Sequence, residues 1–168
     1  MDSAWASLMN AWQHPLLTGA MGTVTWFGSL SLLLPLALGM GWRERAEWRR
    51  FAFLPLAVLG AAGVAHVLKW LVNRERPDLF PSLIAMPADA SFPSAHAMQV
   101  TAFVGAWLLW RGDARLLPLL LGCTLVLLVA VSRTYLQVHF FSDVVAGIVA
   151  GALWAVVLER LLALKRKD

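Results

Sequence analysis

The chain has 168 residues, of which 60% are hydrophobic and 14% are charged. Its mean hydropathy of +0.68 is too high for a soluble globule of this size, so we expect lipid to form part of its solvent. The net charge of +4 could indicate a nucleic-acid partner, but the basic residues fall in short clusters between apolar runs, which is typical of membrane topology. We therefore expect no nucleic-acid binding. The one cysteine, Cys123, excludes an intrachain disulfide and a cysteine-rich metal site.

The first 18 residues differ from the rest of the chain. Ahead of a break at His14-Pro15, four apolar residues fall on one face of a helix: Trp5, Leu8, Met9 and Trp12. An apolar stripe of this kind is typical of a helix that lies in the membrane interface. We expect an interfacial helix over residues 1–18, with a frayed tail as the alternative. Residues 1–19 contain no Lys or Arg, so no signal peptide is expected.

Five apolar runs follow, and most are long enough to cross about 30 Å of hydrocarbon as helices. They cover residues 19–41, 51–72, 96–110, 116–132 and 141–164. The segment 73–95, rich in Pro, Asp and Ser, is expected to be a loop. Gly147 and Gly151 are four residues apart, which indicates close helix packing. The expected fold is an all-α polytopic membrane bundle of five to six helices, forming one domain over residues 1–168.

The charge pattern predicts how the bundle is oriented. Five crossings place the connections 42–50 and 111–115 and the C-terminus on one side, which carries ten of the fourteen basic residues: Arg43, Arg45, Arg49, Arg50, Arg111, Arg115, Arg160, Lys165, Arg166 and Lys167. The positive-inside rule makes that side cytoplasmic, in an inner or plasma membrane. The loop 73–95 and the turn 133–140 are then extracytoplasmic. Four basic residues remain for that side and invite a specific explanation: Lys69, Arg74, Arg76 and Arg133.

Three short motifs lie at the extracytoplasmic ends of the expected helices. The first is Lys69, six residues, then Arg76-Pro77; the second is Pro93-Ser94-Ala95-His96; the third is Ser132-Arg133, five residues, His139, three residues, then Asp143. The orientation was derived from charge alone, yet it places all three motifs on one membrane face. We therefore expect their side chains to form a single site.

The residue types in these motifs suit a phosphoryl group. Lys69, Arg76 and Arg133 supply three cations, and arginine forks match pairs of phosphate oxygens. Ser94 is a natural N-cap, and the free amides of the helix that it starts point at an anion. The sequence contains no carboxylate cluster suited to magnesium, so we expect these cations to stabilise the transferring phosphate without a metal or other cofactor.

The two motif histidines predict covalent catalysis. His139 and Asp143 are one helical turn apart, so the carboxylate can bond one ring nitrogen and leave the other as a nucleophile. His96, across the phosphate site, is expected to act as the acid that protonates the departing oxygen. Arg74 and Glu75 could contact the head group of a lipid, but we expect them to be a solvated loop pair. Asp78 and Asp89 are expected to be loop and capping residues.

Together the motifs resemble the signatures K-x6-R-P, P-S-G-H and S-R-x5-H-x3-D of the type 2 phosphatidic acid phosphatase superfamily. The resemblance runs from Lys69 to Asp143, about half the chain, and the one departure is Ala95 in place of the motif glycine. It implies that Lys69, Arg76, Arg133, Ser94 and the amide of Ala95 bind phosphate. It also implies that His96 is the general acid and that His139 forms a phosphohistidine with Asp143 as its partner.

The sequence leaves the substrate and the oligomeric state open. We rank undecaprenyl diphosphate first, because the site is expected to face outward, ahead of phosphatidylglycerophosphate, phosphatidate and lipid A phosphates. A lipid phosphotransferase is the nearest enzymatic alternative. A lipid-phosphate binding or transport protein without turnover is the alternative from another class, although it has little use for a His–Asp pair and a second histidine. The expected partners are the lipid substrate and membrane lipids.

Overall fold

A computed structural model describes residues 1–112 and 115–162, and these residues contain helices and no strand. The helices are α1 (Asp2–Ala11), α2 (Pro15–Val24), α3 (Leu30–Gly41), α4 (Trp48–Val72), α5 (Ala95–Arg111), α6 (Leu116–Tyr135) and α7 (Phe141–Leu162), with 3-10 turns η1 (Thr25–Gly28) and η2 (Trp42–Glu44). The last residues of the fifth expected span and the basic residues Lys165, Arg166 and Lys167 lie outside this description. The all-α class predicted from the sequence is confirmed.

Three helices are long and apolar enough to cross a membrane: α4, α6 and α7. A fourth candidate is a bent pair, in which the segments Pro15–Gly28 and Leu30–Glu44 meet at 48°. The expected single helix over 19–41 is therefore broken in two, and it begins earlier than expected. Helix α5 has 17 residues and is shorter than the other spans. The chain is an integral membrane helix bundle.

The break in the first span has a local cause at Ser29. Its backbone is extended, with φ −78° and ψ 143°. Its Oγ accepts a hydrogen bond from the Leu32 amide and donates one to the Trp26 carbonyl, so Ser29 starts α3 and closes η1. Gly28 lies against α5, where a Cβ atom would come within 3.0 Å of the His96 carbonyl oxygen. The break thus allows η1 to pack beside His96.

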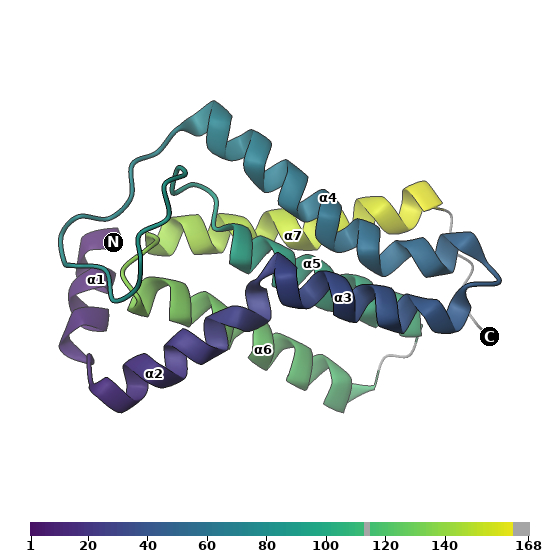
Figure 1. Cartoon of the computed structure of the whole chain (residues 1–168), viewed down its shortest axis with the longest axis horizontal. Coiled ribbons are helices and arrows are strands. Elements are labelled where there is room, and N and C mark those ends of the chain that lie inside the picture. Colours follow the sequence, from purple (N-terminus) through teal and green to yellow (C-terminus); the bar gives the residue numbers. More distant parts are fainter. Residues whose placement is uncertain (113–114, 163–168) are drawn as a thin grey trace.

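Helix α5 lies in the middle of the bundle, with α3, α4, α6 and α7 packed around it (Figure 1). Its contact with α7 is the closest in the fold because Gly147 and Gly151 face it. A Cβ at Gly147 would lie 2.7 Å from the Ser94 carbonyl oxygen, and one at Gly151 would lie 2.4 Å from that of Met98. The close packing predicted for these two glycines is confirmed, and it brings the start of α7 to the start of α5.

The N-terminal helix α1 packs across the α6–α7 connection at one end of the bundle (Figure 1). The rings of Trp5 and Phe141 are 4.8 Å apart, and Gln137 Nε2 donates to the Ala6 carbonyl at 3.1 Å. The expected helix over 1–18 ends at Ala11, and residues from Pro15 onward belong to α2. These contacts anchor α1 instead of leaving it frayed.

One end of the bundle carries the motif residues, and the other end carries the basic connections. The long loop 73–94, the α6–α7 connection and α1 lie together at one end, whereas the α3–α4 connection and the ends of α5 and α7 lie at the other (Figure 1). At the second end, Arg50 Nη2 donates to the Trp110 carbonyl at 2.9 Å. The basic connections and the motif residues are therefore at opposite ends, as the charge pattern predicted.

Candidate active site

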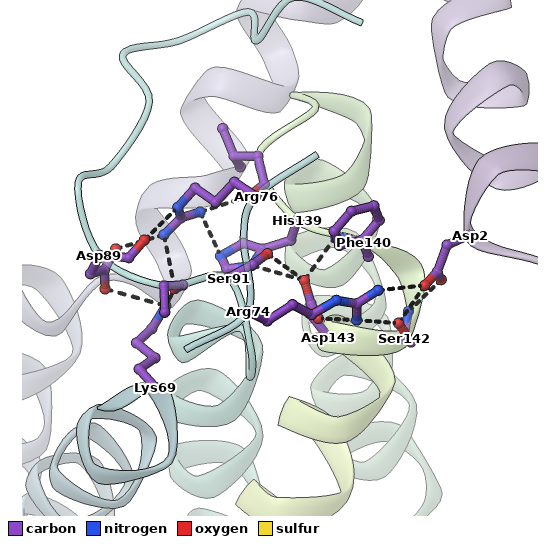
Figure 2. Close-up of polar contacts among 12 residues, drawn as sticks. Asp2, Lys69, Arg74, Arg76, Asp89, Ser91, His139, Phe140, Ser142 and Asp143 are labelled. Atoms are coloured by element: carbon purple, nitrogen blue, oxygen red, sulfur yellow. Dashed lines mark hydrogen bonds and ion pairs between the residues drawn. The ribbon is translucent and has the colours of Figure 1, made fainter. Parts of the chain in front are cut away.

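The eight residues predicted for the site come from six segments of the chain. Lys69 is in the last turns of α4, Arg76 in the loop 73–94, Ser94 at the N-cap of α5, Ala95 and His96 in its first turn, Arg133 near the end of α6, His139 in the α6–α7 connection, and Asp143 in the first turn of α7. All of these positions are at the end of the bundle that carries the long loop (Figures 1 and 2).

His139 lies between a carboxylate and a guanidinium. Its Nδ1 is 3.7 Å from Asp143 Oδ2, and its Nε2 is 3.4 Å from Arg76 Nη1 (Figure 2). An arginine nitrogen can only donate, so Nε2 must be the acceptor in that contact, and the ring proton is then on Nδ1, facing Asp143. The Nε2 lone pair therefore points toward the Arg76 guanidinium.

The surroundings of His139 keep the imidazole neutral. His139 is 4% exposed, and its pKa is lowered from 6.5 to about 4, with burial as the main cause. Within this net shift the Asp143 carboxylate raises the pKa, while the charges of Arg133, Arg76 and Lys69 lower it. At neutral pH the ring is uncharged, which is the state that a nucleophile requires.

Lys69 and Arg76 both contact Asp89, which was predicted to be a loop or capping residue. Its carboxylate lies 3.2 Å from Lys69 Nζ and 2.6 Å from Arg76 Nη2 (Figure 2). Lys69 also donates to the Ala90 carbonyl, and Arg76 Nη1 donates to that of Val138 at 2.6 Å. Burial raises the pKa of Asp89, but these two cations more than offset it, so the pKa is lowered. The expectation that Asp89 is only a loop or capping residue was wrong, because it is the anion between two motif cations.

Arg133 and Ser94 are buried beside His96. Arg133 Nη1 donates to Thr25 Oγ1 at 2.7 Å. Its Nε and the Ser94 Oγ are buried without a hydrogen-bond partner among the residues that the structure describes. Buried polar atoms of this kind are costly unless a partner satisfies them, and a phosphate oxygen could serve both.

A cavity of about 440 Å³ opens beside His96 and Arg133. The bent first span and the loop 73–94 form its other walls: Gly22, Thr25, Trp26, Ser29, Ile84, Ala85 and Pro87. The methyl group of Ala95, in place of the motif glycine, packs against an apolar cluster that includes Ala61, Ala65 and Met98. This packing holds the methyl group among the helices.

Two further residues, Ser91 and Arg74, contact the motif side chains and were not predicted to do so, and Asp2 contacts Arg74. Ser91 Oγ donates to Asp143 Oδ2 at 2.5 Å and lies 3.4 Å from His139 Nδ1. Arg74 Nη1 donates to Asp143 Oδ1 at 2.7 Å and Nη2 to Asp2 Oδ2 at 3.0 Å, so the expectation of a solvated Arg74 was wrong. The partners of Ser91 and Arg74 lie 52 to 72 residues away in the chain. The one signal in the sequence that could have indicated a role for Arg74 is its positive charge on a membrane face that should avoid such charge.

Comparisons with known proteins show the family to which the chain belongs. The family model of the PAP2 superfamily matches residues 50–167. The chain belongs to the PAP2 superfamily. It is 31% identical over 152 residues to phosphatidylglycerophosphatase B of Bacillus subtilis, covering 84% of this chain and 73% of that protein. It is 37% identical over 137 residues to decaprenylphosphoryl-5-phosphoribose phosphatase of Mycobacterium tuberculosis, covering 77% and 68%.

Two solved structures share the fold. The transmembrane PAP2-type phosphatidylglycerolphosphate phosphatase of Bacillus subtilis superposes with a TM-score of 0.85 at 26% identity, covering 99% of this chain and 87% of that one. LpxE of Aquifex aeolicus superposes with a TM-score of 0.78 at 23% identity, covering 95% and 94%, and this likeness shows the fold alone. The PAP2 membership predicted from the motifs is confirmed, and with it the class of enzyme, a membrane lipid phosphatase that hydrolyses phosphoester bonds.

Proposed function

We propose that this PAP2 chain, acting as one membrane-embedded domain, hydrolyses a lipid phosphate or diphosphate through a phosphohistidine on His139. One observation carries the proposal. The Nε2 lone pair of His139 faces the Arg76 guanidinium, the charges of Arg133 and Lys69 also act on this ring, and Asp143 lies on the Nδ1 side. A phosphate bound by those cations would therefore face a neutral nitrogen nucleophile.

The first step transfers the phosphoryl group. The Nε2 lone pair forms a bond to phosphorus as the bond from phosphorus to the lipid oxygen breaks, and His96 gives its proton to that oxygen. In the second step His96 takes a proton from water, the water oxygen bonds to phosphorus, and the phosphorus–nitrogen bond breaks to release phosphate. Asp143 stabilises the charged imidazole that exists between the two steps.

The cations stabilise the charge that develops on the equatorial phosphate oxygens. Lys69, Arg76 and Arg133 are the three cations of the proposed phosphate site. The Ser94 hydroxyl and the Ala95 amide, at the start of α5, are positioned to complete the cradle. Within residues 1–112 and 115–162 no group of three or more His, Cys, Asp or Glu side chains could hold a metal ion. We propose that the reaction needs no metal, because protein cations occupy the role that a metal has in other phosphoryl-transfer enzymes.

Undecaprenyl diphosphate is our first candidate substrate. The charge pattern favours a site on the extracytoplasmic face, with the C-terminus cytoplasmic. The mycobacterial relative is named for a decaprenylphosphoryl substrate, which is also a polyprenyl lipid. Phosphatidylglycerophosphate is the second candidate, because one curated relative and one solved structure, both from Bacillus subtilis, are named for it. The cavity between the bent first span and the loop 73–94 is where the lipid next to the phosphate would lie.

The test measures phosphate release from purified protein in detergent with EDTA present. Wild type is compared with His139→Ala and His96→Ala on undecaprenyl diphosphate, phosphatidylglycerophosphate and phosphatidate. We expect wild-type turnover in EDTA and losses of about 10³-fold or more for both variants. Arg43→Gln, an exposed change at the other end of the bundle, is the control and should retain wild-type turnover.

Each part of the proposal fails on a different outcome. Equal rates for wild type and His139→Ala would exclude the histidine nucleophile. Loss of wild-type activity in EDTA would exclude a metal-free reaction. Transfer of phosphate to an added alcohol in preference to water would identify the phosphotransferase alternative.

A further inference from the structure

The carboxylate of Asp143 is held from two sides by groups that the proposed reaction steps do not use. Its Oδ2 accepts hydrogen bonds from Ser91 Oγ at 2.5 Å and from the Phe140 amide at 3.0 Å. Its Oδ1 accepts from Arg74 Nη1 at 2.7 Å. The side chain is 0% exposed, so Asp143 lies between His139 on one side and the Arg74 guanidinium on the other (Figure 2). A buried charge of this kind needs such a partner.

Arg74 is itself held by the first residues of the chain. Its Nη2 donates to Asp2 Oδ2 at 3.0 Å, its Nη1 also donates to Ser142 Oγ at 2.8 Å, and the guanidinium lies 4.1 Å from the centre of the Phe140 ring. Asp2 accepts from Ser142 twice, from its hydroxyl at 2.6 Å and its amide at 3.0 Å. The Asp2 carboxylate therefore caps the start of α7 from a different helix.

These contacts join three parts of the chain at the nucleophile's partner. Asp2 is in α1, Arg74 is at the start of the loop 73–94, and Asp143 is in the first turn of α7. The Arg74 carbonyl also accepts from the Ser91 amide at 2.8 Å, so the two ends of the loop are tied where Asp143 is held. The position of the Asp143 carboxylate is thus set by Arg74 and Ser91, and the position of Arg74 by Asp2.

The distance between Asp143 and His139 makes this positioning important. At 3.7 Å the Oδ2–Nδ1 contact is longer than a hydrogen bond, so a small movement of the carboxylate decides whether the Nδ1 proton is bonded. Hydrogen bonds of this type in catalytic sites often shorten only when substrate is bound. A carboxylate that is free to turn away would leave the Nδ1 proton of His139 without its charged acceptor.

We propose that Arg74 and Asp2 are positioning residues of this site: the carboxylate of α1 holds the Arg74 guanidinium against Asp143 and so keeps Asp143 aimed at His139. The inference rests on the proposed function and extends it to the N-terminal helix. The competing interpretation is that Asp2 and Arg74 only fasten α1 to the bundle. In that case their loss lowers stability and leaves the turnover of folded enzyme unchanged.

The experiment uses the whole chain in detergent, with the lipid phosphate that wild type hydrolyses fastest. The variants are Asp2→Asn, Arg74→Gln, their double variant and Arg74→Lys. Glu75→Gln removes an exposed carboxylate next to Arg74, and Arg43→Gln removes an exposed guanidinium at the other end of the bundle, so these are the matched controls. kcat, KM and the melting temperature are measured for each.

We expect Arg74→Gln to lower kcat about 10- to 100-fold with KM changed less than about threefold, as for outer groups that orient a reacting residue. Asp2→Asn keeps an oxygen for the Ser142 amide but loses its charge, and should lower kcat about three- to tenfold. The double variant should be no worse than Arg74→Gln, since Asp2 acts through Arg74. Arg74→Lys should recover part of the loss, and both controls should match wild type.

Wild-type kcat in Arg74→Gln, or losses that multiply in the double variant, would overturn the inference. His139→Ala is measured alongside to separate the two proposals. If it is inactive while Arg74→Gln is normal, only the positioning role fails; if it is as active as wild type, the proposed function fails first. Should Arg74→Gln not fold, Asp2→Asn decides by the same criterion: reduced kcat at wild-type KM supports the inference, and unchanged kcat overturns it.

Discussion

The imidazole of His139 is oriented before any substrate arrives, because the two ring nitrogens face groups of opposite charge. Asp143 lies on the Nδ1 side and Arg76 on the Nε2 side. The arrangement selects one tautomer and one ring orientation. Folding therefore already fixes the orientation of His139, the proposed nucleophile, and less free energy has to be supplied in the transition state.

The low pKa of His139 predicts activity at mildly acidic pH. Burial is the main cause of its lowering from 6.5 to about 4, so the nucleophile stays unprotonated as the pH falls through 6.5. We expect kcat/KM, corrected for ionisation of the substrate, to hold to about pH 5 and to decline below it. An acidic limb centred near pH 6.5 would show that His139 titrates as an ordinary histidine.

The same lowering of the pKa affects stability with a definite sign. Between pH 6.5 and about 4 the unfolded chain binds a proton on this histidine and the folded chain does not. The contribution of His139 therefore reduces the free energy of unfolding as the pH falls through this window. In this pH window the imidazole of His139, the proposed nucleophile, stays unprotonated, while the free energy of unfolding falls.

Asp89 predicts a variant with tighter phosphate binding. Its carboxylate occupies Lys69 and Arg76, the cations proposed to bind phosphate. Asp89→Asn removes the competing charge, so we expect the inhibition constant of inorganic phosphate to fall about two- to tenfold. Inhibition assays at several phosphate concentrations measure it, with Asp78→Asn, an exposed change in the same loop, as the control. Weaker inhibition in Asp89→Asn would mean that Asp89 organises the two cations instead of competing for them.

At this scale the sequence predicted the residues with a local signature and missed those without one. Lys69 with Arg76, and His139 with Asp143, each stand at a recognisable spacing within one segment. Asp2 and Ser142 are 140 residues apart, and Arg74 and Asp143 are 69 apart, so only the folded chain brings them together. No periodicity can predict a contact made by two loops and a remote helix.

Among the elements, the pairing of α5 with α7 controls the geometry of the site. The N-cap of α5 and the first turn of α7 are joined by the Ser94 amide, which donates to the Asp143 carbonyl at 3.0 Å. Gly147 and Gly151 allow the two helices to approach this closely. A change in their separation would move the phosphate cradle relative to the nucleophile's partner.

Gly147→Ala is expected to reduce activity through this pairing. Its new methyl carbon would lie 2.7 Å from the Ser94 carbonyl oxygen and 3.2 Å from Ala97 Cβ, so the start of α5 must shift. We expect a loss of kcat/KM of about tenfold or more and a stability loss of about 1–3 kcal/mol. Kinetics and thermal melting in detergent measure both. Gly63→Ala, where nothing lies within 4 Å of the added carbon, is the control.

The break in the first span was not predicted, and the reason is the composition of that segment. Residues 19–41 form an unbroken apolar run, and hydropathy reports length without reporting direction. The Gly28-Ser29 pair was the available signal, because a serine followed by an apolar run can start a new helix. The interruption at His14-Pro15, in contrast, was predicted, since proline has a strong local effect.

For the whole molecule, the distribution of charge and the location of the motifs agree. The α3–α4 connection, which carries the exposed Arg43, lies at one end of the bundle, and the loop 73–94, which carries Asp78, lies at the other (Figure 1). The agreement does not depend on the motifs, since the orientation came from Lys and Arg alone. The side of the membrane that each end faces stays a prediction.

Cysteine labelling tests the predicted sidedness. On a Cys123→Ser background, Asp78→Cys is expected to react with a membrane-impermeant maleimide in intact cells, and Arg43→Cys only after permeabilisation. The physical reason is the excess of Lys and Arg at the Arg43 end, which favours retention in the cytoplasm. Labelling of Arg43→Cys alone in intact cells would place the site inside.

The cavity beside His96, where we propose that the lipid lies, is lined mostly by segments other than those that carry His139. Its walls come largely from residues 22–29 and 84–87, whereas His139, the proposed nucleophile, and Asp143 belong to the α6–α7 connection and the first turn of α7. The residues that line the cavity can therefore be exchanged while His139 and Asp143 stay unchanged. Exchange of those two short stretches between relatives offers a direct way to alter lipid preference while turnover chemistry is preserved, and natural divergence within the superfamily could follow the same path.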